Sequence, residues 1–439
     1  MKRLHILVLR TANGSSVDSA ECAELAALKP PTDFCRGVLV TVLVVLSVVL
    51  LGAGAVLAGD PGVTDNEIVI GTSAGLTGPI AMWGNRMARI GPQAYFNYIN
   101  EQGGVHGRKI KHVVLDDGYQ PPRSVANHKR LIQRDKVFAL LASMGTPTVT
   151  ASIQTILGNK VPLIAPATGA HKWGYDEKYR PWVFQVGADY WHMAAVAVDY
   201  VIEHKGLKKW CVFYQDDDYG KDVLNGTIEQ LTQHNLKVVA TETYKRGGID
   251  VSGQVTKLRS AGCDVVMLGT VYRSGSLFVR EREKLGWDVQ TVGIAPTATQ
   301  TFVDLAGSAG VGHLNTMSNP PVDADREGVK QFRELMTEYF PDEKISEEAL
   351  YGFIAAKTFV AGLKAAGRDL TRESLIAGMR SLKDYDNGIT DTITYGPEDH
   401  QGVTASYMLE IVKDDQKDES GNDKYKFKRI SDWINPKGY

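Results

Sequence analysis

The stretch "EIVIGTSAGLTGPIAMWG", residues 67–84, opens a regular alternation that decides the fold. A β-branched run at 68–73 ends at Gly78-Pro79, a pair that turns the chain out of a strand. From here onward, short β-branched runs alternate with longer amphipathic runs, which predicts parallel sheets with helices on both faces. The predicted strands are 68–73, 110–116, 137–141, 162–165, 210–214, 238–244, 265–269 and 291–293.

The amphipathic runs predict helices, and their spacing divides the chain into two groups. Eight strand–helix units are more than one open sheet usually holds, and the stretch 168–187 after the fourth unit is long, aromatic and irregular. We therefore expect an α/β fold with two doubly wound, Rossmann-like lobes of four units each. Irregular strands are expected at 387–433. The predicted helices are 93–102, 123–135, 149–157, 190–204, 221–233, 252–261, 274–285, 327–339 and 346–366.

Residues 71–75 fit the G-x-S-x-G pattern of a serine hydrolase, with Ser73 at the nucleophile position. A nucleophile elbow requires a sharp turn at the serine and a helix that begins at once. Here Ser73 continues the predicted strand, and Gly78-Pro79 would break a helix begun at Gly75. The stretch also lacks a Walker lysine and G-x-G-x-x-G spacing. We therefore expect neither a hydrolase nor a nucleotide site, and Ser73 is predicted to be structural.

The first 58 residues differ from the rest of the chain. An uncharged apolar run at 38–51 follows Arg36, and small residues up to Ala58 fit a signal-peptidase site. We interpret residues 1–58 as an export leader that is removed, which predicts a periplasmic protein. The alternative is an uncleaved membrane anchor, because the run with its flank approaches the ~20 residues that span a bilayer.

The charge of the chain and its cysteine and histidine residues bear on whether it binds nucleic acid, a metal or a cofactor. The formal net charge of −2 over 439 residues argues against a nucleic-acid partner. Cys211 and Cys263 are the two cysteines beyond the leader. An exported compartment permits a disulfide, but their apolar neighbours favour buried free thiols. His171 and His192 have no partner at metal spacing and are expected on loops or at the surface. We expect no metal and no cofactor.

Three loops follow predicted strands at the edge where open α/β sheets bind ligands. The first two offer hydroxyls and backbone N–H groups, which suit a carboxylate if they lie at helix N-termini. Trp83, Trp173 and Tyr272 would add apolar faces. Each aromatic residue alone is more often packing than ligand contact, so their convergence is what predicts a site. The loops are "SMGTPT" at 143–148, "APATGAHKW" at 165–173 and "GTVYRSG" at 269–275.

Four motifs in order resemble the periplasmic solute-binding proteins that serve branched-chain amino acid ABC importers. They are "LTGPIAMWG" for S/T-G-P-x-A-x-x-G, "INEQGGVHGRKI" for I-N-x-x-G-G-x-x-G, "LDDGYQPPRSVA" for D-D-x-x-x-P-x-x-A, and "DDDYGKD" for D-x-x-Y-G. The resemblance implies a type I periplasmic binding fold, with two lobes joined by three crossovers that close on a ligand in the cleft. It also implies a small-molecule ligand and the membrane permease of an ABC importer as partners. We expect a monomer that binds without catalysis.

The resemblance also assigns lobes and site residues by position. Lobe 1 is expected at 65–188 plus 319–390, and lobe 2 at 189–318 plus 391–433. Trp83 is expected against the ligand side chain, two loops are expected to hold its carboxylate, and second-lobe residues are expected to close over it. The expected site residues are Trp83, Met144, Gly145, Thr146, Ala167, Thr168, Gly169, Tyr190, Tyr219, Val271, Tyr272 and Ala295.

The departures from the family pattern bear on the ligand. Amino-acid binders of this family hold the ammonium with a Thr and a Glu, and the matching positions here are Gly169 and Ala295. Thr168 is a candidate for the lost hydroxyl, but no replacement carboxylate is evident, and an ammonium buried without an acceptor is costly. We therefore hypothesise a carboxylate or amide head on an apolar, aliphatic or aromatic body, without a free α-ammonium. The alternatives are a conventional branched-chain amino acid binder and a sensory protein of the same fold. Pro92 should kink its helix or delay its start.

Overall fold

The computed structural model describes residues 60–417 and 421–437, so the predicted leader lies outside the described residues. Strand β1 (Glu67–Ala74) lies inside a five-stranded parallel sheet, between β2 and β3. Ile68 and Ile70 are buried, and Ser73 continues the strand as predicted. The sheet order is β2-β1-β3-β4-β5. Its other strands are β2 (Lys109–Asp116), β3 (Ala139–Leu141), β4 (Leu163–Ile164) and β5 (Val183–Phe184).

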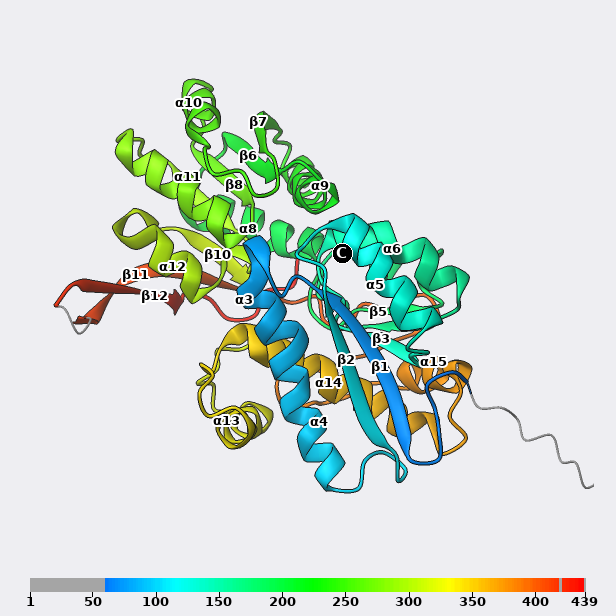
Figure 1. Cartoon of the computed structure of the whole chain (residues 1–439). Helices are drawn as coiled ribbons and strands as arrows, with labels where there is room; N and C mark the ends of the chain where they lie inside the picture. Colours follow the sequence, from blue (N-terminus) through cyan, green and yellow to red (C-terminus); the bar gives the residue numbers. More distant parts are fainter. Residues whose placement is uncertain (1–59, 418–420, 438–439) are drawn as a thin grey trace, which may run out of the picture. The chain divides into compact units, whose positions relative to one another are not determined.

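A second sheet has the order β12-β11-β10-β9-β8-β6-β7. Its strands from β6 to β10 are parallel, and β11 and β12 add an antiparallel edge. The two-lobed α/β fold predicted from the alternation is confirmed (Figure 1). The strands are β6 (Trp210–Gln215), β7 (Val238–Tyr244), β8 (Val265–Gly269), β9 (Gln290–Gly293), β10 (Leu314–Met317), β11 (Tyr407–Lys417) and β12 (Asp423–Arg429).

The expectation of four strands per lobe was wrong, because the sheets have five and seven strands. β5 lies inside the stretch 168–187 that was expected to be irregular, and it pairs with β4 as the edge of the first sheet. β10 was missed as well. Both strands are short, with two and four residues, so neither shows a periodicity long enough to detect.

Helices follow most of the strands, as the alternation predicts. The helix after β1 is not uniform: a short α3 passes through a π-helical segment, Gly84–Ile90, into α4, where Pro92 occupies the first turn. Pro92 therefore lies where the π-helical segment changes to the α-helix, and it does not delay the start of the helical run, which begins at Ala81. The helices are α3 (Ala81–Trp83), α4 (Gly91–Glu101), α5 (Pro121–Gln133), α6 (Thr146–Gly158), α7 (Lys172–Tyr175), α8 (Tyr190–Lys205), α9 (Asp218–Gln233), α10 (Ser252–Ser260), α11 (Tyr272–Lys284), α12 (Gln300–Ala306), α13 (Glu327–Tyr339), α14 (Glu347–Ala366) and α15 (Arg372–Arg380).

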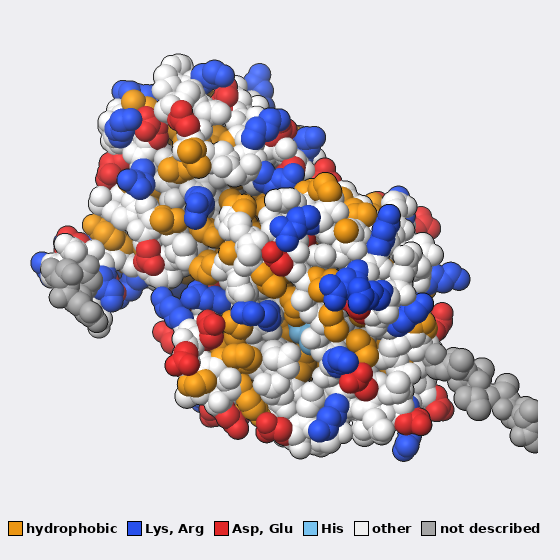
Figure 2. All heavy atoms as spheres, in the orientation of Figure 1, with side chains coloured by type: hydrophobic (Ala, Val, Ile, Leu, Met, Phe, Trp, Pro, Cys, Tyr) orange, Lys and Arg blue, Asp and Glu red, His pale blue; other side chains and the backbone are white. Residues whose placement is uncertain are grey.

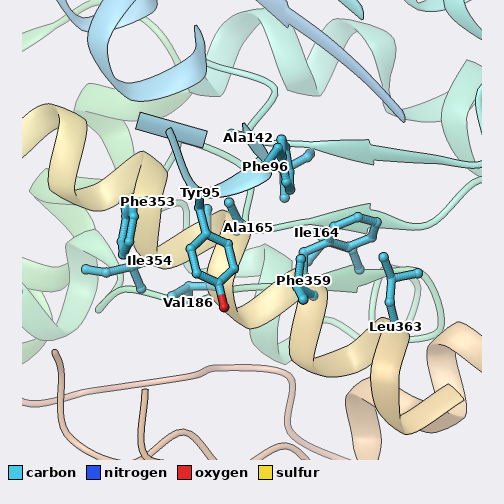
Figure 3. Close-up of a cluster of buried hydrophobic side chains, with 14 of the residues drawn as sticks. Tyr95, Phe96, Ala142, Ile164, Ala165, Val186, Phe353, Ile354, Phe359 and Leu363 are labelled. Carbon is cyan, nitrogen blue, oxygen red and sulfur yellow. The ribbon is translucent and has the colours of Figure 1, made fainter. Parts of the chain in front are cut away.

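The first sheet packs against a helix from much later in the chain. Phe353, Ile354, Phe359 and Leu363 of α14 are buried in one cluster with Phe96 of α4 and residues of β3 and β4 (Figure 3). Of the described helices, α14 alone is long and apolar enough to cross a membrane, but most of it is buried inside the protein. A core helix explains that composition. α14 also sits close to α4, because a Cβ at Gly91 would meet the carbonyl oxygen of Ala349 at 2.1 Å.

Cys211 and Cys263 form a disulfide, with Cα atoms 5.9 Å apart. The preference for free thiols was therefore wrong. Cys211 lies on β6, and Cys263 precedes β8, the strand that pairs with β6. Because that pairing brings the two residues together across 52 positions of sequence, the bond depends on topology that apolar surroundings alone do not reveal.

Acidic and basic side chains are interspersed over the face shown in Figure 2. This mixture agrees with the near-balanced charge of the chain.

Candidate functional site

A cavity of about 120 Å³ is lined by residues at the ends of strands of both sheets and at the N-termini of several helices. Its wall is largely apolar, with a few hydroxyl, amide and carboxylate groups, which is the usual composition of a small-molecule site. The lining residues are Ile80, Trp83, Met87, Tyr119, Met144, Gly145, Thr146, Ala167, Thr168, Gly169, Gln185, Gly187, Ala188, Tyr190, Met193, Tyr219, Val271, Ala295, Pro296, Ala298, Thr299, Met317, Ser318, Asn319, Glu347, Glu348 and Tyr351.

The structure brings eleven of the twelve predicted site residues to this one cavity. Tyr272 is the exception: it does not line the cavity but packs edge-on against Trp83, with ring centroids 5.0 Å apart. Its hydroxyl donates a hydrogen bond to the carbonyl oxygen of Pro79 at 2.8 Å. Tyr272 therefore supports the wall behind Trp83. Trp173, by contrast, is fully buried in a separate core cluster away from the cavity.

The N-terminus of α6 forms one part of the cavity wall. Gly145 is the N-cap and makes no side-chain cap, and Pro147 has no N–H, so the N–H groups of the first turn are those of Thr146 and Thr148, which have no partner from within the helix. Glycine is required here because φ is +93° and a Cβ would meet the Tyr119 ring at 2.6 Å. Thr146 and Thr168 place their hydroxyl oxygens 2.6 Å apart. Because one of these hydroxyls donates to the other, the pair has one hydrogen left for an anion, in addition to the open N–H groups of Thr146 and Thr148.

Tyrosine rings form much of the apolar wall. Tyr190 and Tyr219 pack edge to face, with centroids 4.9 Å apart, and the hydroxyl of Tyr219 donates to the carbonyl oxygen of Thr270 at 2.9 Å. Burial raises the pKa of both tyrosines above the ordinary value. They therefore stay neutral and act as ring surfaces with hydroxyl tips. Gly169 makes room for this arrangement, because a Cβ there would meet the Tyr190 ring at 2.9 Å.

Two carboxylates that the sequence reasoning missed also line the cavity. Glu347 and Glu348 occupy the first turn of α14, behind the N-cap Ser346. Glu348 is 5% exposed and lies 3.7 Å from Arg86, and its Oε2 accepts no hydrogen bond from the part of the chain that the structure describes. Burial raises the pKa of Glu347. The inference that the cavity has no replacement carboxylate was therefore wrong.

The missed residues share a reason. Acidic residues after an N-cap serine are typical of any helix start, so "SEEAL" predicts α14 but not where its first turn lies. Its position follows from the close packing of α14 on α4 near Gly91 and of Gly352 on Met87. Tyr119, also missed, lies in the "LDDGYQPPRSVA" motif, whereas no motif indicated the remaining missed polar lining residues, which are Gln185, Thr299, Ser318, Asn319 and Tyr351.

The two histidines expected on loops or at the surface converge on one buried carboxylate. His171 Nδ1 lies 2.8 Å from Asp189, and His192 Nδ1 lies 3.0 Å from it. His192 is 2% exposed, so the expected surface position was wrong. Burial opposes the charge of Asp189, but its hydrogen bonds to the two histidines outweigh that effect and lower its pKa to about 2. Asp189 also caps α8 by accepting from the His192 N–H. The cluster anchors the start of α8 behind the cavity wall.

The profile of the periplasmic binding protein family matches residues 67–417. An "Amino acid binding protein" of Pseudomonas aeruginosa is 29% identical over 242 residues, which cover 55% of this chain and 64% of that relative, less than two thirds of its length. "Leu/Ile/Val-binding protein homolog 1" of Brucella abortus is 26% identical over 70% of this chain and 81% of that relative. The solved structure of a fatty acid ABC transporter substrate-binding protein from Thermomonospora curvata has a TM-score of 0.76. It is 24% identical and covers 87% of this chain and 96% of that one, a likeness of fold.

Proposed function

The chain belongs to the periplasmic binding protein family, and from that premise we propose that it captures a small carboxylate with an apolar body and delivers it to an ABC importer. The proposal includes export to the periplasm, binding as a monomer without turnover, and docking on the membrane permease. It also includes the lobe boundaries at 65–188 plus 319–390 and at 189–318 plus 391–433, with closure of the lobes over the ligand.

The observation that carries the proposal is the open N-terminus of α6 in an otherwise apolar cavity. Its uncapped N–H groups and the Thr146–Thr168 hydroxyl pair favour a compact anion. A carboxylate there would have several donors within a water-poor site, where charge-assisted hydrogen bonds are strong. We assign this end of the cavity to the ligand's carboxylate.

The rest of the wall suits an apolar body. Trp83, Tyr190 and Tyr219 present ring faces or edges, and Met87, Met193 and Met317 add flexible thioether chains. Aromatic and methionine side chains adapt to either an aliphatic or an aromatic ligand body. The relatives agree with this breadth, since amino acids and fatty acids share a carboxylate joined to an apolar chain.

A branched-chain amino acid is the second candidate ligand. Glu347 and Glu348 line the cavity, so an acidic group is available although Gly169 and Ala295 lack one. An ammonium in this cavity would therefore have a carboxylate within the wall to accept its hydrogen bonds, which the sequence analysis did not foresee. The names of the two curated relatives favour the same candidate.

Isothermal titration calorimetry of the purified protein tests the proposal. We expect binding of at least one apolar carboxylate from a panel of C4 to C10 aliphatic acids, aromatic acids and branched-chain amino acids, with the corresponding alcohols and methyl esters inert. Replacing both hydroxyls, Thr146→Val with Thr168→Val, should weaken binding by roughly tenfold or more. Thr155→Val on the same helix, outside the cavity lining, is the matched control. Equal binding of acids and esters would contradict the proposal.

A further inference from the structure

Two polar groups of the cavity wall have no hydrogen-bond partner among the described residues. Glu348 Oε2 is a buried acceptor without a donor, and Trp83 Nε1 is a buried donor without an acceptor. Both residues line the cavity, and Glu348 is 5% exposed. A buried polar group left unsatisfied costs free energy, so such groups in a cavity wall indicate what the occupant supplies.

The two groups belong to the same section of the wall. Glu348 forms its ion pair with Arg86, which lies three residues after Trp83 on the continuous helix of α3 and the π-helical segment. Tyr272 packs against Trp83, and its pKa is raised first by burial and further by the charge of Glu348. The ion pair and the ring contact of this section involve neither Thr146 nor Thr168, which lie at the α6 end.

The chemistry of the two groups selects the ligand group that satisfies them. A hydroxyl donates one hydrogen bond and accepts others, so it can donate to Glu348 and accept from Trp83. An ammonium could donate to Glu348 but could not accept from the indole. A methyl group or ring edge would leave both unsatisfied. Arg86 already opposes the charge of Glu348, so a neutral donor is sufficient there.

We propose that this cavity recognises hydroxylated apolar carboxylic acids, and that Glu348 and Trp83 form the hydrogen bonds to the ligand's hydroxyl. This inference rests on the proposed function, because the carboxylate is assigned to the α6 end. The two polar ends then hold the ligand in a single orientation across the apolar wall. Specificity follows mainly from the penalty on ligands that lack the hydroxyl.

Matched ligand pairs test the inference by calorimetry. The probes are 4-hydroxybenzoate and benzoate, 3-(4-hydroxyphenyl)propanoate and 3-phenylpropanoate, and 6-hydroxyhexanoate and hexanoate, with phenylalanine and leucine as the ammonium arm. In at least one pair we expect the hydroxylated member to bind about tenfold more tightly or better. It should also bind more tightly than either amino acid.

Two variants connect that preference to the residues. Glu348→Gln replaces the charged acceptor by a weaker neutral one, and Trp83→Phe removes the N–H while keeping an aromatic ring. Each should reduce the preference for the hydroxylated member by roughly fivefold or more, with a smaller change for the unhydroxylated member. Glu343→Gln, an exposed residue before α14, and Trp287→Phe, outside the cavity, are the matched controls. If Glu348→Gln fails to fold, Trp83→Phe decides.

The outcomes separate this inference from the proposed function. Equal binding of both members in every pair, or a preference that survives in both variants, overturns the inference and leaves the proposed function standing. Tightest binding by an amino acid overturns it in favour of an ammonium. If no carboxylate binds at all, the proposed function fails and the inference fails with it.

Discussion

The N-termini of α6 and α14 line the same cavity, but they differ in how their backbone N–H groups are capped. The N-cap of α6 is Gly145, which supplies no side-chain cap, and the first turn is Thr146-Pro147-Thr148, so the N–H groups of the two threonines remain open. α14 is capped by Ser346 and carries Glu347 and Glu348 in its first turn. Both ends have the same positive dipole, but one helix already supplies its own anions. Under the proposed assignment, side chains, more than the dipole, decide that the α6 end accepts an anion and the α14 end accepts a hydrogen-bond donor.

Thr146→Asp would make α6 resemble α14, and it should have the largest effect. A carboxylate at the first residue of α6 would satisfy the helix dipole and repel a ligand carboxylate at close range. We expect carboxylate affinity to fall by at least ~100-fold, while thermal stability is kept or raised slightly. Titration calorimetry and a melting curve measure the two effects. The isosteric neutral variant Thr146→Asn is the control, and carboxylate binding by Thr146→Asp that matches this control would refute the assignment of the α6 end.

Trp83→Ala tests the apolar wall between the two ends. Removing the indole takes away ring contact with the ligand and the partner of Tyr272. We expect binding weaker by roughly 10- to 100-fold with the fold intact, since buried aromatic residues dominate such sites. Titration and circular dichroism give the two readings. Trp182→Ala, outside the cavity lining, should bind as the wild type does; unchanged affinity in Trp83→Ala would mean that the cavity is misassigned.

Ser346→Ala removes the cap that distinguishes α14 from α6. The Ser346 hydroxyl accepts from the Ala349 N–H at 3.3 Å, and losing such a cap costs about 1 kcal/mol of unfolding free energy. We expect a lower midpoint in chemical denaturation with affinity changed less than threefold. Ser260→Ala, an exposed serine at the end of α10, serves for comparison. No change in the midpoint would show that the carboxylates alone stabilise this helix start.

Glu347→Gln should give the smallest effect, and it depends on pH. Burial raises the pKa of Glu347 above its ordinary value of 4.5 in the folded protein. The folded state therefore holds the proton of Glu347 more tightly than the unfolded chain does. The contribution of Glu347 to the free energy of unfolding is fully present below pH 4.5 and is lost as the pH rises through the folded-state pKa. The glutamine variant should melt at a slightly higher temperature than the wild type at pH 7. That advantage should disappear towards pH 4, and an advantage that is constant with pH would contradict the account.

The α6 end of the site could be predicted from the sequence, whereas the α14 end could not. The "SMGTPT" loop was recognisable because it follows a strand directly, so its place at the sheet edge follows from local order. Glu347 and Glu348 lie about two hundred residues further on, and their place depends on the fit of α14 against α4 at Gly91. The disulfide between Cys211 and Cys263 likewise depends on the pairing of β6 with β8.

Short elements were the other limit. Regular runs such as Val238–Tyr244 and Val265–Gly269 were predicted with their observed bounds, because β-branched residues persist over several positions. The two-residue strand β5 has no such pattern, and backbone pairing with β4 defines it. Tertiary contacts therefore determine which residues form the edge strand of the first sheet, as they determine where Glu347 and Glu348 lie.

We propose above that the ligand's carboxylate lies at the N-terminus of α6. A crystal structure of the protein with the ligand that it retains through purification, identified by native mass spectrometry, would locate that carboxylate. We expect a carboxylate oxygen at hydrogen-bond distance from the Thr146 N–H or hydroxyl, with the apolar body against Trp83. A ligand without a carboxylate, or one whose carboxylate lies beside Glu348, would contradict it.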